Sequence, residues 1–388
     1  MKQERGFTLL ELLIVTAIMA VALAVTSDMF LGLLNQYKQQ SKLAETNIEG
    51  IIGLELLRQD VERAGYGLPW VIPAGLTYSE AASSAYAQIC NEPAPGGTSN
   101  PPRPMVTVNN VGFVDQASGA MGIGQADYLA IKAVNIPGSG SSQLWSYLTT
   151  SVIKSWDEPS ENLAPTDYVI VLSPETTAAS FRTLALGSSS HWYATFQNLS
   201  ANGFVPAQLS PQPLFVYGLG TTAVPTMPFN RADYYIQGPP SSQVPIPTRC
   251  APNTGVLVKS VVSQGTGSMG GPLPLLDCVA DLKVIFRLDT DNDGIIDYNT
   301  DVLNDKSTAA PLTAQQIRTQ VKEIRIYILA QEGQMDNSFT YPSPTITVGE
   351  FGLGHTFTVG ANVNDLNVHY RWKVYTIVAS PKNMRQSS

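Results

Sequence analysis

Charged side chains are scarce in this chain. They make up 14% of its 388 residues, and acidic groups outnumber basic ones to give a net charge of −8. A chain with so few cations cannot neutralise a row of phosphates, which argues against a nucleic-acid partner. The low charge and the 31 glycines and 27 prolines are more typical of exported β-rich proteins than of cytosolic enzymes. The mean hydropathy is close to zero, so the chain as a whole is not a polytopic membrane protein.

Cysteine and histidine are also rare. There are three of each, and their spacing contains neither a CxxC motif nor a zinc-binding pattern. In an oxidising compartment, three cysteines most simply form one disulfide and leave one buried thiol. Cys90 and Cys250 both lie in proline-rich loops, whereas Cys278 lies at the entry of an apolar strand. We therefore expect a disulfide between Cys90 and Cys250, and a bond between Cys250 and Cys278 is the alternative.

Catalytic motifs are missing as well. The sequence has no GxSxG, Walker or HExxH motif and no spacing typical of a nucleophile with its base, so no enzymatic activity is predicted. His191, in SSSHWYATF, is interpreted as a residue at the end of a strand rather than as a base. Trp145, Trp192 and Trp372 are expected to fill the core of the β region.

The most informative segment that is present is the apolar N-terminal run RGFTLLELLIVTAIMAVALAV, which contains a single carboxylate, Glu11. Its length predicts a membrane-spanning helix over about residues 7–30, and the preceding Lys2 and Arg5 favour a cytoplasmic N-terminus. A charged carboxylate inside a bilayer is costly and therefore points to a function. A secretory signal peptide would explain the basic start and the apolar core, but no A-x-A-like cleavage site ends this run.

The helical pattern continues beyond the membrane-sized run. Apolar residues recur every three or four positions, so we expect one helix over residues 7–66, whose second half packs on a soluble domain. The GYG sequence at 65–67 and Pro69 end the helix. The residues expected to face the domain are Ala44, Ile48, Ile51, Leu54, Leu57, Val61 and Ala64.

Strand patterns dominate the rest of the chain. Residues 67–104 form a connection rich in proline, glycine and serine, and residues 105–388 contain many short runs of β-branched and aromatic residues bounded by turn residues. We therefore predict an α+β fold, in which a long N-terminal helix packs against a large, mainly antiparallel β head. Within this body, residues 85–270 carry no motif that indicates a function.

An acidic segment, DTDNDGIID, follows one of the predicted strands and resembles the calcium loops of many extracellular proteins. Its aspartates alternate along the chain, as the oxygen ligands of Ca²⁺ do, and Gly294 stands at the sixth position, where such a loop turns sharply. The alternative is an acidic turn that is held by Asx hydrogen bonds without a metal. We predict a structural Ca²⁺ ion in the loop 289–301, with ligands from Asp289, Asp291, Asp293, Ile295 (through its carbonyl), Asp297 and Asp301.

RGFTLLELLIV resembles the processing signal of type IV pilins and pseudopilins, in which a short basic leader ends at a Gly-Phe junction and glutamate is the fifth mature residue. The resemblance implies that a prepilin peptidase removes residues 1–6 by cutting between Gly6 and Phe7, and that it methylates the new amine of Phe7. It also implies that Glu11 neutralises the amine of a neighbouring subunit inside a fibre. A carboxylate in lipid becomes tolerable when a cation is held against it.

Later segments resemble the PilW-type minor pilins, whose counterpart in type II secretion is the J pseudopilin. The resemblance implies a minor pilin that helps prime assembly of a type IV pilus and sits at or near its tip. The implied partners are other minor pilins, the major pilin and a large tip adhesin. The head would be periplasmic, on a single-pass inner-membrane helix, until assembly brings it to the cell surface. A J-like pseudopilin, or a tip adhesin acting through residues 85–270, is the alternative. The segments that carry the resemblance are LELLRQDVERAGYG, CVADLKVIFRLDTDNDGIIDY, VKEIRIYILAQEG and YRWKVYTIVASPKN.

Overall fold

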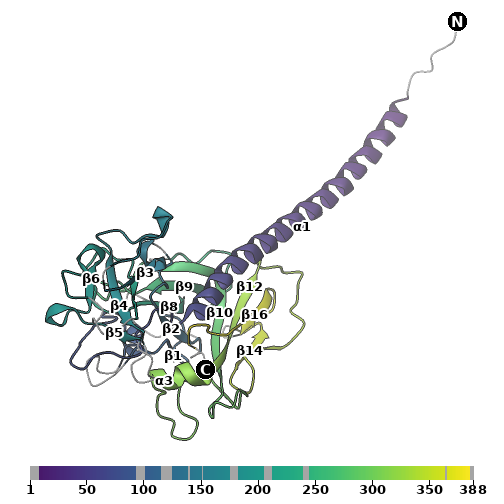
Figure 1. Ribbon diagram of the computed structural model, residues 1–388. Coiled ribbons are helices and arrows are strands. Elements are labelled where there is room, and N and C mark those ends of the chain that lie inside the picture. The colour runs from purple at the N-terminus through teal and green to yellow at the C-terminus, as the bar shows by residue number, and fades with distance from the viewer. Residues whose placement is uncertain are drawn as a thin grey trace.

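In the computed structural model, a long helix projects from a head that is built mostly of strands (Figure 1). The predicted α+β fold is therefore confirmed. Gly6 and Phe7, the expected processing site, lie outside the described part of the chain, as do the side chains of Ala44 and Ile48. The structure describes residues 8–92, 101–114, 125–138, 140–150, 152–174, 182–204, 212–238, 244–362 and 365–384.

Helix α1 (Leu9–Arg63) is one continuous element, close to the expected range of 7–66. Gly65 and Gly67 follow it with φ angles of +82° and +66°, a conformation that glycine adopts without strain, and they turn the chain away from the helix axis. The backbone N–H of Gly65 donates to the carbonyl of Lys132 at 3.0 Å. The end of the helix is therefore fastened to the head by its own backbone.

A large sheet forms the centre of the head. Its long middle strands are rich in β-branched and aromatic residues, and most of their side chains are buried. The pairs are antiparallel throughout the described residues. In spatial order the strands are β1 (Met105–Val108), β2 (Tyr128–Ala133), β8 (Asn230–Gln237), β9 (Gly255–Val261), β10 (Leu273–Leu288), β12 (Val321–Glu332) and β16 (Arg371–Ala379), while β11 (Tyr298–Thr300) pairs with β10.

Smaller elements complete the head. A second sheet contains β3 (Trp145–Leu148), β7 (Leu214–Gly218), β4 (Tyr168–Ser173) and β5 (Thr183–Leu184) in that order, and β6 (Tyr193–Thr195) pairs with β4. A third contains β13 (Thr345–Val348), β14 (His355–Gly360) and β15 (Leu366–Asn367). The short helices are α2 (Ala85–Ile89) and α3 (Ala314–Gln320), and single 3₁₀ turns span Gly140–Gln143, Pro159–Glu161, Ser188–Ser190 and Phe196–Asn198.

The C-terminal half of α1 packs on the large sheet, against β10, β12 and β16. Four members of the predicted stripe, from Leu54 to Ala64, are buried there, but Ile51 is 65% exposed, so that part of the prediction is wrong. Gly50 and Gly53 are buried in this contact. An added Cβ at Gly53 would stand 1.8 Å from the carbonyl oxygen of Leu275 in β10. At Gly53 the helix also approaches the sheet without a side chain, and a pattern of apolar residues does not predict such a contact.

The disulfide joins Cys250 to Cys278, with 4.9 Å between their Cα atoms, so the expected Cys90–Cys250 bond is wrong. The reason lies in the pairing of β9 with β10, which sets Gly255 opposite Val279. This register brings Cys278, next to Val279 in β10, close to Cys250, which lies just before β9. Cys90 is free and fully buried. One disulfide and one buried thiol were expected, but the partner was set by strand pairing rather than by the loops' similar composition.

Two of the three tryptophans that were expected in the core are buried, since Trp192 is 8% and Trp372 is 5% exposed. Trp145 is only half-buried. It lies on β3, an edge strand of the second sheet, where part of the ring remains in contact with solvent. The expectation that Trp145 fills the core is therefore wrong.

Candidate functional site

The first turn of α1 holds Glu11 in a capping box with Thr8. The Thr8 hydroxyl accepts a hydrogen bond from the Glu11 backbone N–H at 3.3 Å, and the Glu11 carboxylate accepts from the Thr8 backbone N–H at 2.9 Å and from its hydroxyl at 3.0 Å. Such a box supplies partners to backbone N–H groups that the helix itself cannot satisfy. Glu11 therefore has a local structural role at the helix end, in addition to any role between subunits.

The segment Leu9–Lys38 of α1 is long and apolar enough to cross a membrane, and none of it is buried against the rest of the described chain. Large apolar side chains along it, from Leu9 to Leu34, are 39% to 82% exposed. In water this would be a continuous apolar surface far larger than a soluble monomer carries. A lipid bilayer, or a bundle of similar helices, is the environment that its composition fits.

A buried ion pair fixes the C-terminal half of α1 to the head. The Asp60 carboxylate accepts hydrogen bonds from the Lys259 ammonium of β9 at 2.6 Å and from the Tyr234 hydroxyl of β8. Burial and the neighbouring Asp60 carboxylate raise the pKa of Tyr234 well above its ordinary value, so this phenol remains a neutral donor. Asp60 belongs to the segment LELLRQDVERAGYG, which resembles the PilW-type minor pilins. The sequence does not reveal its two partners, which lie more than 170 residues away.

The last turn of the helix has a further contact with the C-terminal part of the head. The Lys382 ammonium lies 2.6 Å from the Glu62 carboxylate, and the Lys382 backbone N–H donates to the Glu62 carbonyl at 3.0 Å. The charged groups are partly exposed, so the ion pair itself adds little stability, but the backbone hydrogen bond fixes the direction of the chain.

A second cluster of buried charges joins residues 67–92 to the head. Lys132 of β2 lies 2.9 Å from Glu80 and 2.5 Å from Glu92, and Arg231 of β8 lies 3.1 Å from Glu80 and 2.7 Å from Asp233. Burial disfavours the charged form of Glu80, but the two cations outweigh it and lower its pKa. Removing one member would leave the others buried without a counter-ion. The described parts of the expected connection, residues 67–92 and 101–104, are therefore part of the head.

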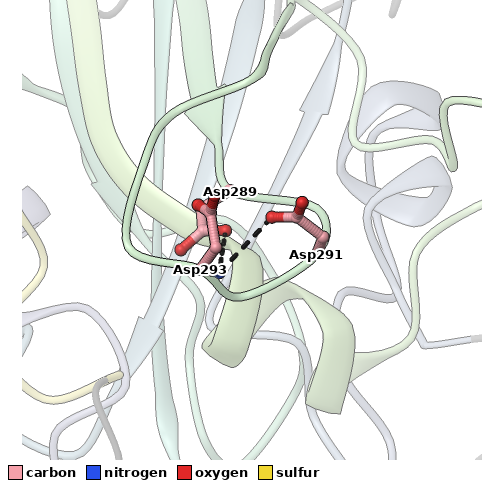
Figure 2. A group of neighbouring side chains, drawn as sticks. All are labelled: Asp289, Asp291 and Asp293. Carbon is pink, nitrogen blue, oxygen red and sulfur yellow. Dashed lines mark hydrogen bonds between the residues drawn. The ribbon is translucent and has the colours of Figure 1, made fainter.

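The acidic loop brings three of its predicted ligands together (Figure 2). One carboxylate oxygen from each of Asp289, Asp291 and Asp293 lies within 4.8 Å of the others. The Asp289 carboxylate also accepts from the backbone N–H groups of Asp293 at 3.1 Å and Gly294 at 2.9 Å. Gly294 has a φ of +92°, which explains why glycine stands at this turn. Oxygen atoms converging in this way suit a hard cation such as Ca²⁺.

Two of the remaining predicted ligands have other contacts in the structure. The Asp297 carboxylate accepts from the Thr290 hydroxyl at 2.6 Å and its N–H at 2.8 Å, and it pairs with Lys306 at 3.0 Å; these contacts lower its pKa. Asp301 pairs with Lys283 at 2.7 Å, and Ile295 has a 68% exposed side chain. The structure thus groups three of the six predicted ligands and gives two of the others alternative partners.

The N-terminal segment is also the part of the chain that the comparisons identify. Residues 1–27 match the family model of the prokaryotic N-terminal methylation motif. No curated protein and no solved structure matches the chain significantly. The motif is the signal of type IV pilin-like proteins and implies processing by a prepilin peptidase and assembly with other pilins. Together with the one membrane-length apolar helix among the described residues, it indicates a membrane-anchored structural subunit and supports an assignment to the type IV pilins and pseudopilins.

Proposed function

We propose that this protein is a PilW-type minor pilin that helps prime assembly of a type IV pilus and sits at or near its tip. The observation that carries the proposal is the methylation motif, which continues without a break into an exposed apolar helix joined to a large β head. The head would lie in the periplasm before assembly and on the surface pilus afterwards. Other minor pilins, the major pilin and a large tip adhesin are the proposed partners.

In this mechanism, cleavage after Gly6 exposes the amine of Phe7, four residues before Glu11 in the sequence. The apolar surface of Leu9–Lys38 then packs beside the helices of neighbouring subunits. In that low-dielectric environment an unpaired carboxylate is costly, whereas a carboxylate beside the Phe7 ammonium of a neighbour is compensated. Glu11 therefore favours one lateral arrangement of subunits over others.

The capping box makes a sharp test possible, because glutamine can replace glutamate in it. Glu11→Gln keeps the helix cap and removes the charge, whereas Glu11→Ala removes both. We expect both variants to insert into the inner membrane at normal levels and to be missing from sheared fibres. The matched control is Asp28→Asn, which removes another exposed carboxylate of the same helix and should leave incorporation unchanged. Normal incorporation of Glu11→Gln would contradict the proposed pairing.

The position in the fibre needs a separate measurement. Immunogold labelling of the head on isolated pili should mark fibre ends, and deletion of the gene should reduce the number of fibres rather than their thickness. Labelling along the whole shaft would contradict a tip position, and normal fibre numbers in the deletion would contradict a role in priming.

We further propose that the loop 289–301 holds a structural Ca²⁺ ion through Asp289, Asp291 and Asp293, with Ile295, Asp297 and Asp301 as the additional expected ligands. The support is the convergence of three carboxylates around one turn. Thermal unfolding should shift upward with millimolar CaCl₂ in the unmodified protein, a concentration range typical of extracellular sites. Asp291→Ala should abolish the shift, and Asp305→Ala, an acidic residue outside the group, should retain it. An unchanged calcium shift in Asp291→Ala would reject the site.

A further inference from the structure

A small cavity lies at the edge of the second sheet, within the 85–270 region to which no function was assigned. Its volume is about 250 Å³, and it is lined by Gln143, Leu144, Trp145, Trp156 and Glu161. Trp145 belongs to the edge strand β3, and Trp156 and Glu161 belong to the loop that follows it. Two indole rings and a carboxylate in one small cavity form an unusual combination for a surface that only needs to be soluble.

The two indoles pack against each other in an edge-to-face contact. Their ring centroids are 4.9 Å apart with an interplanar angle of 63°, and both side chains are half-buried, so parts of both rings face solvent. Tyr147 lies beside Trp156 with a centroid distance of 6.3 Å, which extends the aromatic surface along β3. An aromatic ring presents a negative face, so the solvent-facing parts of these rings can contact a cation.

Hydrogen bonds hold this arrangement without a ligand. The Trp156 indole N–H donates to the Trp145 carbonyl at 2.8 Å. The Asn162 side chain accepts from the Trp156 backbone N–H at 2.7 Å and donates to its carbonyl at 2.9 Å. The loop is therefore bonded to itself and to the edge strand. A site that is already ordered loses less entropy when a ligand binds.

The charge around the cavity favours a cation. Glu161 is exposed, lines the cavity and forms no ion pair among the described residues, and Asp157 and Glu158 are exposed in the same loop. Lys154 is the loop's cation, and its ammonium already lies 5.6 Å from the centroid of the Trp156 ring. This distance is within the range of a cation–π contact. With three exposed carboxylates and one lysine, the negative charge of this loop disfavours an anionic ligand and favours an ammonium ligand.

We infer that this cavity binds an organic ammonium group, of which trimethylammonium is the type, against the solvent-facing parts of the Trp145 and Trp156 rings with the Glu161 carboxylate as counter-ion. Methylated ammonium groups are weakly hydrated, so they are the cations that aromatic walls recognise best. The inference uses only residues of the head and is independent of the pilin assignment, so either can fail without the other.

The test uses the full chain in maltoside micelles, with choline as the probe and calorimetry as the measurement. The neutral isostere 3,3-dimethylbutan-1-ol has the same shape without the charge, and it should bind about tenfold more weakly because the cation–π attraction is lost. Trp156→Ala should weaken choline binding by at least about tenfold, and Trp156→Phe should recover part of it. Equal binding of choline and its isostere, tighter binding of a neutral sugar such as methyl glucoside, or undetectable choline binding would overturn the inference.

A second pair of variants avoids any question of misfolding. Glu161→Gln changes an exposed side chain and should weaken choline binding several-fold while the melting temperature stays the same. Glu158→Gln changes an exposed carboxylate of the same loop that does not line the cavity, so it should have a smaller effect. Equal effects of the two variants would refute a specific role for Glu161. Glycerophosphocholine then identifies the source: affinity equal to that of choline indicates a lipid headgroup, and weaker binding indicates a free ammonium compound.

Discussion

Gly53 provides the most direct test of how the helix is attached to the head. Its neighbour is the backbone of β10, at the irregular start of the strand, where the pairing register shifts between Pro274 and Leu276. A methyl group at position 53 would lie 1.8 Å from the Leu275 carbonyl oxygen and 2.6 Å from its carbon. A backbone carbonyl cannot rotate away as a side chain can, so the substitution Gly53→Ala must move the helix or the strand.

The magnitude follows from the displacement required. To restore an ordinary contact of 3.4 Å, the methyl group and the carbonyl oxygen must separate by about 1.6 Å. The packing of Leu54, Leu57 and Val61, all buried in the same contact, would loosen as the helix moves. Overpacking of this kind costs about 1–3 kcal/mol or more, and alanine returns only about 1 kcal/mol through its better helix propensity. We therefore expect Gly53→Ala to be destabilised by about 2 kcal/mol.

Gly50→Ala is the matched control, one helical turn away on the same face. Its new methyl group would lie 3.2 Å from the end of the Leu276 side chain, which can adjust, so the propensity gain of up to about 1 kcal/mol should dominate. Both free energies of unfolding can be measured by urea titration of the full chain in maltoside micelles, followed by near-ultraviolet circular dichroism. If Gly53→Ala proves as stable as Gly50→Ala, the close approach of helix and strand is wrong.

Three further predictions concern the stability of the head in the same assay. Asp60→Ala should cost about 3–5 kcal/mol because it leaves the Lys259 ammonium buried without a partner, and adding Lys259→Met should restore much of the loss; no recovery would contradict the explanation. Cys250→Ala should cost about 3–4 kcal/mol, the value expected for closing a loop with a sequence separation of 28, and a loss below 1 kcal/mol would be inconsistent with it. Burial raises the pKa of Asp127 to about 6 in spite of Lys283, so its stabilising contribution is complete below pH 4 and is lost as the pH rises through 6. Relative to Asp127→Asn, the stability of the unmodified protein should thus fall by roughly 2 kcal/mol between pH 4 and 7, and parallel pH profiles would refute this.

Local patterns in the sequence were sufficient to predict the elements of the fold. Helix α1 is long and apolar and has clear stop signals at Gly65 and Gly67, and the strands are short alternating runs between turn residues. The acidic loop is equally local, since Asp289, Asp291 and Asp293 are brought together by one turn. When the residues of a feature lie within about ten positions of each other, local backbone geometry brings them together, and the sequence pattern is enough to predict that geometry.

Features that depend on distant pairing could not be predicted in this way. Cys250 bonds to Cys278 because of the register between β9 and β10, and no composition of the flanking loops reveals that register. The salt bridges of Lys132 and Arg231 with Glu80 likewise join three separate segments. In an alternating strand pattern, charged residues are expected to face solvent. The alternation shows that a strand has two different faces, but it does not show whether both faces are covered by other parts of the protein.

The joint between helix and head combines these local and distant features in a way that suits the proposed assembly. If lateral contacts of its helix pull a subunit out of the membrane, the pulling force on the helix must be transmitted to the head. Three contacts at the helix end reach different parts of the head: Asp60 to Lys259 in β9, Gly65 to Lys132 in β2, and Glu62 to Lys382 after β16. The close approach at Gly53 adds a contact with β10. Because these contacts lie on three different strands and on the segment after β16, the force would be distributed over the head instead of peeling one strand from the edge of the sheet, and the helix and head would move as one body.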